Sequence, residues 1–534
     1  MAPVTETVVL GLDGATWDVL DPLVEAGELP NLAALLEGGR AGPLESTVPP
    51  VTAPAWLSMA TGRNPGKTGV FYFSRRDSPD SYEFTPVDAG DFEGWSVWDR
   101  LAASDESVGV FNVPMLYPPY DVDGYVVSGV GAPEDGPHAR PAEVAEELEA
   151  VTGGYELKIP YASPKYDGRP GALAEDLERV LEKRGAAVEH LLESRPTDHF
   201  FGVLSATDWA QHYFWPEHDP DHPLHDPESP HREVLTRVWR QVDEVVGTVA
   251  DIAERRGATL LLVSDHGFGP TERTFHVTEW LEREGFLVRP DSAPASRTRV
   301  RYFPMLRRAG EAVARAVPRL SGLLERLGRR LRGDQHAAID FERSVAFAPR
   351  QNLGMGLLYL LDDDEAVRAS LVAELEATAD ELGIELEVLD SDEHHHGAAA
   401  ALAPDVLFTM DGLACAVDAR KQPDAPLLET GPPSRARSAN HRMDGIYLLA
   451  GDGVEATTER VELDLLDVAP TVLYAHDVAV PDDADGTART DAFTPEFSSE
   501  RTLRRTESSG ERSAASDAGE LDDVTDHLAD LGYR

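Results

Sequence analysis

The sequence is poor in cysteine and in long apolar runs. Cys415 is the one cysteine among 534 residues, so no intrachain disulfide can form, which suits a reducing cytosol. No window reaches the roughly 18 apolar residues that a membrane helix needs. The N-terminal segment MAPVTETVVLGLDG has no basic region, and Asp13 interrupts its short apolar run, so it does not resemble a signal peptide. These absences predict a cytoplasmic protein without a transmembrane segment.

Positive charge is also scarce. Lys and Arg number 48 against 96 Asp and Glu, which gives a formal net charge of −48 at pH 7. The acidic excess is spread along most of the chain, and the basic residues are nearly all Arg, with Lys at scattered positions such as Lys67 and Lys158. A non-specific nucleic-acid binder shows the opposite sign of charge, so we expect no nucleic-acid partner.

The acidic excess predicts a dependence on salt. Self-repulsion of this size destabilises a compact state at low ionic strength, whereas at 1 M salt the Debye length falls to about 3 Å. The composition therefore indicates adaptation to a salty cytoplasm, such as that of a halophilic archaeon. We expect thermal unfolding measured across a salt series to show the fold stabilised by added salt and lost when salt is removed. A fold that is lost on addition of salt would contradict this interpretation.

Strand and helix patterns alternate along the chain. Apolar, β-branched runs predict strands at 7–12, 108–114, 199–208, 258–267, 405–410 and 445–451. Helical spacing occupies 17–39, 170–194, 230–256 and 365–383. This alternation predicts an α/β fold: a doubly wound, mostly parallel sheet flanked by helices, with a helical or cap insertion. In such sheets ligands bind beyond the carboxyl ends of the strands.

Composition divides the chain into four predicted parts. These are a first part of the α/β core at 1–290, an Arg-rich helical insert at 291–340, a second part of the core with small cap elements at 341–484, and a largely disordered acidic, Ser-rich tail at 485–534. Two interpretations of the Arg-rich stretch 297–332 stay open. It is either a solvated helix whose arginines pair with the acidic body, or a lid that attracts an anionic substrate or lipid surface.

Acidic residues and histidines stand where predicted strands end. Asp13 follows the first strand, and Asp265 and His266 end the strand LLVSDHG. Asp208 and His212 are four residues apart, so on a helix they lie on one face and could bind the same metal ion. Taken singly, each of these residues is better explained by a structural or solvated position than by metal binding. The run His394-His395-His396 offers metal ligands too, although a surface loop explains it as well.

Thr52 precedes Ala53-Pro54 and an apolar helical pattern. Because Pro is favoured in the first turn of a helix, this position is at or near an N-cap, where backbone N–H groups and the helix dipole favour anions. One interpretation is an ordinary N-cap. The other is an alkoxide nucleophile whose pKa a bound metal lowers.

Six segments carry a family resemblance when they are taken in order. They are GLDGATWD, PPVTAPAWLSMATGRNPGKTGVFYF, SATDWAQHYFW, LLVSDHGFGP, NHRMDGIYLLAG and LDVAPTVLYAHDVAVPDDADG. The sequence from about residue 7 to about residue 487 resembles the alkaline phosphatase superfamily, in particular its type I phosphodiesterase/nucleotide pyrophosphatase branch. The stretch TAPAW has no Arg, which disfavours the sulfatases of the superfamily.

The resemblance implies a role for each of a set of residues. One metal ion would be held by Asp208, His212 and His441, and the second by Asp13, Asp265, His266 and Thr52, with Thr52 also the nucleophile. The implied cofactors are two divalent ions, most consistent with Zn²⁺, with Mn²⁺ or Mg²⁺ as alternatives. Asn64 and Lys67 are candidates for substrate binding, and a surface position in a turn explains them equally well.

The resemblance also implies a reaction. A phosphodiester or pyrophosphate bond would be cleaved through a phospho-threonine intermediate, in a small anionic substrate of the nucleotide or nucleotide-sugar kind. A phosphotransferase, or a phosphomutase or phosphomonoesterase of the same superfamily, is the alternative enzyme. A metal-binding protein without turnover is the alternative outside enzymes. The sequence carries no signal for an oligomeric state.

Overall fold

A computed structural model describes residues 6–289, 339–349, 352–361 and 364–507, apart from 80, 82, 134, 135, 421, 423 and 424. The Arg-rich stretch 297–332 and the tail beyond residue 507 lie outside these described residues, so both predictions concerning them stay predictions. Among the helices of the described residues, none has both the length and the apolar character needed to cross a membrane.

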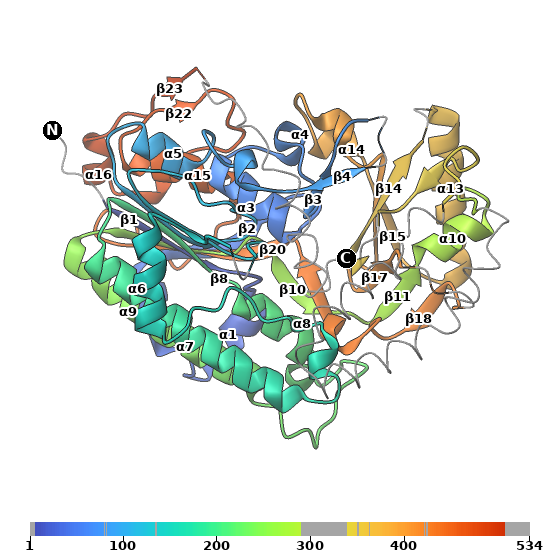
Figure 1. Ribbon diagram of the computed structural model, residues 1–534, viewed down its shortest axis with the longest axis horizontal. Coiled ribbons are helices and arrows are strands. Elements are labelled where there is room, and N and C mark those ends of the chain that lie inside the picture. Colours follow the sequence, from blue (N-terminus) through green and yellow to red (C-terminus); the bar gives the residue numbers. More distant parts are fainter. Residues whose placement is uncertain are drawn as a thin grey trace.

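A nine-stranded sheet forms the centre of the molecule (Figure 1). Its spatial order is β21 (Leu463–Asp464), β2 (Arg40–Glu45), β20 (Asp444–Ala450), β9 (Thr259–Val263), β1 (Thr7–Leu12), β8 (His199–Leu204), β5 (Val108–Val113), β6 (Gly124–Ser128) and β7 (Ala139–Arg140). Strands β9, β1, β8, β5 and β6 run parallel to one another. Strand β20 is antiparallel to β9 and β2, and β7 is antiparallel to β6. The predicted mostly parallel α/β sheet is confirmed.

The register of the central strands brings their carboxyl ends to one edge. Every residue of β1 is buried, as expected of a strand covered on both faces. Leu12 of β1 pairs with Leu204 of β8, and Gly11 pairs with Val263 of β9. The chain segments that follow these three neighbouring strands therefore emerge side by side.

Helices cover both faces of the sheet, as Figure 1 shows. One face carries α1 (Trp17–Glu25), α2 (Pro30–Gly38), α6 (Ala142–Thr152), α7 (Pro170–Ser194) and α9 (Val234–Arg256), and the other carries α3 (Thr52–Thr61), α5 (Val97–Ala102) and α15 (Val468–Ala475). The predicted helix 17–39 is two helices. Gly27, at a φ of 75°, follows the end of α1, and Pro30 begins α2, because glycine tolerates the left-handed turn and proline suits a first helical turn.

A second unit has a hydrophobic core of its own, built around side chains such as Phe275, Trp280, Phe347 and Phe408. It contains two four-stranded sheets, formed by β12 (Ala346–Phe347), β14 (Met355–Leu360), β16 (Val406–Met410) and β15 (Leu386–Leu389), and by β13 (Asn352–Leu353), β17 (Cys415–Asp418), β11 (Arg273–His276) and β18 (Leu428–Thr430). Helices α10 (Val277–Arg283) and α13 (Glu365–Leu382) accompany them. The predicted strand at 405–410 thus belongs to this unit, and β11 and α10 lie before the boundary predicted at 290.

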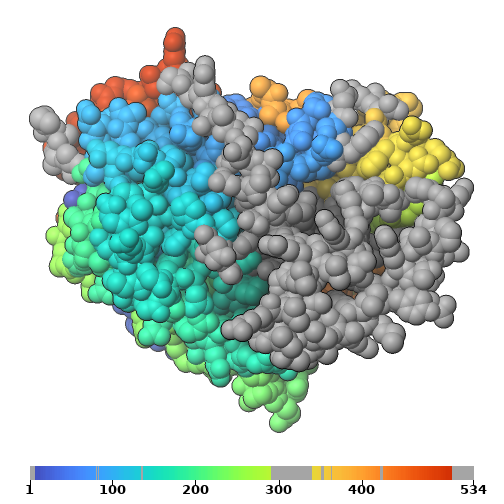
Figure 2. Space-filling model, viewed as in Figure 1, coloured from blue at the N-terminus to red at the C-terminus, as the bar shows by residue number. Residues whose placement is uncertain are grey.

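The two units lie against each other. In the space-filling view, blue residues of the early chain adjoin orange residues of the second unit along the upper edge (Figure 2). Further elements of the described residues are α4 (Pro65–Thr68), β3 (Ser74–Arg76), β4 (Phe84–Pro86), α8 (Ala206–His218), β10 (Gly267–Pro270), α14 (Ser391–His394), β19 (Ala439–Arg442) and β22 (Val480–Pro481).

The beginning of the predicted disordered tail is ordered. Residues 485–507 contain α16 (Pro495–Ser499) and β23 (Arg505–Thr506), and β23 pairs with β22. The Arg501 guanidinium donates from Nε to the Ala475 carbonyl at 2.8 Å, and Phe493 is buried. The few apolar side chains of this stretch are therefore enough to dock it, a tertiary effect that composition did not reveal.

Candidate active site

The residues predicted to follow the strands lie together at the edge of the sheet where β1, β8 and β9 end. Asp13 directly follows β1, and Asp265 and His266 follow β9. Asp208 and His212 lie in α8, which begins after β8. All five side chains are buried in the same region because these strands are adjacent and parallel.

A first group of side-chain atoms that could hold a metal ion lies between α8 and β19. The Oδ1 atom of Asp208 is 3.3 Å from Nε2 of both His212 and His441, and the two Nε2 atoms are 3.2 Å apart. His441 reaches this place because β19 pairs antiparallel with β10, with His441 opposite Phe268. Because β10 begins directly after His266, the pairing of β10 with β19 brings His441 close to His266.

A second group lies at the ends of β1 and β9. His266 Nε2 is 3.2 Å from Asp265 Oδ2 and 3.9 Å from Asp13 Oδ1. The backbone N–H of Gly14 donates to Asp265 Oδ1 at 3.2 Å, which orients that carboxylate. Asp13, Asp265 and His266 offer ligand atoms that all lie within 4.8 Å of one another.

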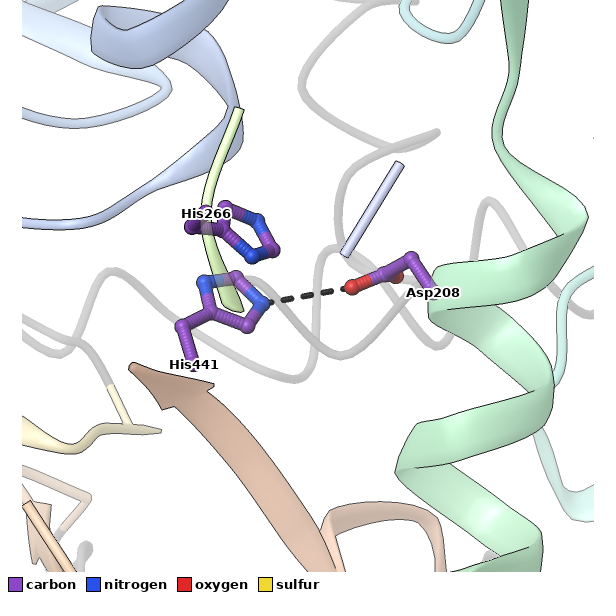
Figure 3. A group of neighbouring side chains, drawn as sticks. All are labelled: Asp208, His266 and His441. Atoms are coloured by element: carbon purple, nitrogen blue, oxygen red, sulfur yellow. Dashed lines mark ion pairs between the residues drawn. The ribbon is translucent and has the colours of Figure 1, made fainter. Parts of the chain in front are cut away.

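The two groups meet at His266. Its ring stacks on the His441 ring with centroids 3.6 Å apart. Ligand atoms of Asp208, His266 and His441 lie within 4.8 Å of one another, and Figure 3 shows the three side chains converging. The resemblance assigned His266 to the second ion alone, whereas the geometry places it next to both groups.

Thr52 is the first residue of α3, and Val51 is its N-cap. No side-chain hydrogen bond caps this helix. Thr52 thus lies next to the N-cap, as predicted, but its side chain does not cap the helix. Its hydroxyl Oγ1 instead lies 3.3 Å from His266 Nε2, at the meeting point of the two groups.

The backbone sets the tautomer of all three histidines. Nδ1 lies within hydrogen-bond distance of a carbonyl oxygen in each ring: 2.8 Å from Ala439 O for His212, 3.1 Å from Gly267 O for His266 and 2.9 Å from Pro50 O for His441. Because a carbonyl only accepts, Nδ1 carries the proton, and the Nε2 lone pair of each ring faces the cluster. Metal-binding histidines use the same arrangement, in which a hydrogen bond from one ring nitrogen orients the other nitrogen toward the ion.

Burial shifts the pKa values of the cluster toward the neutral forms of its side chains. Burial, followed by the neighbouring carboxylates, raises the pKa of Asp13 well above its usual range, and burial likewise raises the pKa of Asp265. Burial lowers the pKa of His212 to about 4 and that of His266 well below its ordinary value, so both rings are neutral near pH 7.

Among the described residues, no hydrogen-bond donor reaches Asp13 Oδ1 or Asp265 Oδ2, although both atoms are buried. Buried carboxylates facing imidazole lone pairs need cations, and oxygen with nitrogen donors suits Zn²⁺, Mn²⁺ or Mg²⁺. The side chains present therefore fit divalent metal ions.

Arg437 is a neighbour of the site that sequence reasoning missed. Its side chain is buried, and its Nη1 atom is 3.0 Å from His212 Nε2. The Tyr161 ring stacks on the His212 ring, with ring centroids 5.6 Å apart and an interplanar angle of 10°. Arg437 stands four residues before His441, but no motif marks it, and only the packing of the 435–437 turn against α8 brings it here.

The structure places Asn64 and Lys67 outside both groups. Asn64 caps α4 by accepting from the Gly66 N–H at 2.7 Å, and its Nδ2 donates to Asp485 Oδ2 at 2.9 Å. The Lys67 ammonium forms an ion pair with Asp485 and donates to the Asp483 carbonyl at 2.7 Å. The histidines of the run 394–396 also belong to neither group.

Comparison with known proteins identifies the family of the chain. The family model described as "Type I phosphodiesterase / nucleotide pyrophosphatase" matches residues 7–367. The chain belongs to this family. Membership indicates a phosphoric ester hydrolase. The match includes Asp13, Thr52, Asp208 and Asp265 but ends before His441, which the β10–β19 ladder brings to the site.

Solved structures share the fold of this family member. Phosphonoacetate hydrolase from Sinorhizobium meliloti 1021, in complex with phosphonoformate, has a TM-score of 0.53 at 15% identity, over 88% of this chain and 94% of that chain. Murine ectonucleotide pyrophosphatase/phosphodiesterase 5, as an inactive Thr-to-Ala variant in complex with AMP, has a TM-score of 0.52 at 12% identity, over 92% of this chain and all of that chain. No curated protein matches the sequence.

Proposed function

We propose that this chain is a two-metal phosphodiesterase or nucleotide pyrophosphatase that cleaves its substrate through a phospho-threonine intermediate at Thr52. The observation that carries the proposal is the position of the Thr52 hydroxyl. It stands at the N-terminus of α3, 3.3 Å from His266 Nε2, where the two ligand groups meet. A helix N-terminus favours an anionic group such as a phosphoryl.

The proposed ligands follow the two groups. Asp208, His212 and His441 would hold one ion, and Asp13, Asp265, His266 and Thr52 would hold the other. When bound, a pair of divalent ions, proposed as Zn²⁺, would neutralise the phosphoryl oxygens and lower the pKa of the nucleophile's hydroxyl.

The side chains of the protein would orient the substrate, and Thr52 would provide the attacking oxygen. Thr52 Oγ1 forms a bond to phosphorus in line with the leaving oxygen, whose bond to phosphorus breaks. Water then attacks phosphorus from the vacated side. The bond between Thr52 Oγ1 and phosphorus breaks, Oγ1 regains a proton from the water, and the phosphomonoester product leaves. Burial of the cluster excludes bulk water, so the fixed charges act strongly on the phosphoryl group.

The proposed substrate is a small anionic phosphate ester of the nucleotide or nucleotide-sugar kind. The neighbouring structure that holds AMP supports this class. The net charge of −48 supports the further proposal that the protein works in a salty cytoplasm.

A substrate panel tests the proposal. We expect an aryl phosphodiester, ATP or UDP-glucose to be cleaved with a higher kcat/KM than an aryl phosphomonoester or an aryl sulfate, in high salt with added zinc or manganese. Product analysis in the presence of an added alcohol separates hydrolysis from transfer. Phosphoryl transfer with little free acid would instead assign the chain to the phosphotransferases, and a preference for the monoester would reject the diesterase assignment.

A further inference from the structure

A loop of the second unit docks beside the segment that carries Thr52. This docking loop consists of residues 391–399 and begins with α14, which lies beside α4 in Figure 1. Ala399 N donates to Gly66 O at 2.9 Å. A Cβ atom at position 66 would lie 2.5 Å from the His396 backbone nitrogen, so the close approach of the two backbones requires the glycine.

Polar contacts hold the docking loop in place. His396 Nε2 is 2.8 Å from Asp485 Oδ1, and Asn64 Nδ2 donates to the His396 carbonyl at 3.1 Å. Asp485 in turn pairs with Lys67. The two residues expected from the sequence to bind substrate therefore anchor a loop of the second unit.

His395 points from this loop into the core. Only 3% of the residue is exposed, and the edge of its ring packs against Phe71, with centroids 4.9 Å apart. Its Nε2 atom is 2.6 Å from the Val48 carbonyl oxygen, and its Nδ1 is 3.0 Å from the Ser391 hydroxyl. The carbonyl accepts only, so Nε2 carries the proton and Nδ1 accepts from Ser391. Burial lowers the pKa of His395 to about 4, which keeps the ring neutral.

Val48 belongs to the segment that leads into Thr52. This segment, residues 46–51, also touches the ligand groups, because Ser46 Oγ donates to the Asp265 carbonyl at 2.6 Å and the Pro50 carbonyl accepts from His441 Nδ1 at 2.9 Å. The segment is thus held on one side by ligand residues and on the other by His395. Val48 and Pro50 stand four and two residues before Thr52 in the same segment.

We propose that His395 is a positioning residue: by holding the Val48 carbonyl, it sets the place of the Thr52 hydroxyl between the two ligand groups. The proposal rests on Thr52 acting as the nucleophile. A displacement of about 1 Å at a reacting atom can cost on the order of 10²-fold in rate. The second unit would then take part in catalysis through one imidazole.

Three variants of the full chain, assayed in high salt with saturating zinc, test this role. For His395→Ala we expect kcat on an aryl phosphodiester to fall on the order of 10- to 100-fold, with KM within about twofold of wild type. His395→Gln should recover most of the rate, because its amide N–H can donate to the same carbonyl. His394→Ala, next in the loop, is the matched control and should match wild type. Metal content should be the same in all three.

Hydrogen exchange of the peptide containing residues 46–52 supplies a readout that needs no turnover. We expect faster exchange in His395→Ala than in wild type and restored protection in His395→Gln. Equal rates and equal exchange in wild type and His395→Ala would overturn the proposal, as would equal losses in the Ala and Gln variants. If Thr52→Ala kept full turnover, the nucleophile assignment would fail separately, and the exchange comparison would still decide whether His395 orders the segment.

Discussion

Replacing Thr52 by alanine is expected to lower kcat for the best phosphodiester substrate on the order of 10³-fold or more, while metal binding persists. The substitution removes the oxygen that would bond to phosphorus. It leaves in place the three carboxylates and three imidazoles of the two groups. Steady-state kinetics measure the loss, and elemental analysis of the purified variant measures bound metal.

Thr52→Ser is the matched control, because it keeps the hydroxyl and removes only a methyl group. We expect it to retain much of the turnover. Acid quenching of wild type during turnover, followed by mass spectrometry, should find the peptide that contains Thr52 carrying the phosphoryl group together with the ester group that the substrate retains. Unchanged turnover in Thr52→Ala would remove Thr52 as the nucleophile, even if both ions were bound.

Removing divalent ions is expected to abolish turnover and to destabilise the fold. Without cations, Asp13 and Asp265 keep buried oxygen atoms that no donor among the described residues reaches, and burial raises the pKa of both carboxyls. A ligand that binds only the folded state at 100 times its Kd stabilises that state by about 2.7 kcal/mol per site. Chelation should therefore lower Tm, and added zinc should restore both Tm and activity.

Variants of single ligands separate the two sites. Asp265→Asn and His441→Ala lie in different groups, so we expect each to reduce the bound metal from about two ions to about one. His190→Ala, whose ring pairs with Glu147 away from either group, serves as the control and should keep both ions. A Tm that responds neither to chelator nor to zinc would refute the metal assignment.

Local pattern was enough to predict several elements. Strand β1 has the predicted bounds of 7–12, and α7 spans the predicted 170–194, because a fully apolar β-branched run and a long amphipathic repeat each have one stable conformation. The four-residue spacing of Asp208 and His212 placed both on one face of α8 for the same reason.

Local pattern did not reveal which core an element joins. The strand predicted at 405–410 exists as β16, but it packs in the second unit. An apolar sequence pattern indicates that a strand is buried, but it does not indicate which other elements the strand packs against. The ordered stretch 485–507 was missed since its few apolar residues dock on surfaces formed elsewhere in the chain. The metal-binding roles of the seven proposed residues stay predictions.

By itself the sequence determined the α/β alternation, the acidic residues at strand ends and the family motifs, since each depends on neighbours within a few residues. Only the tertiary structure decided that β19 carries His441 to Asp208, that His266 adjoins both groups, and that His395 holds the segment before Thr52. Such contacts join residues that are far apart in the chain. They arise when separate elements bury their apolar faces together, and no spacing along the sequence encodes that distance.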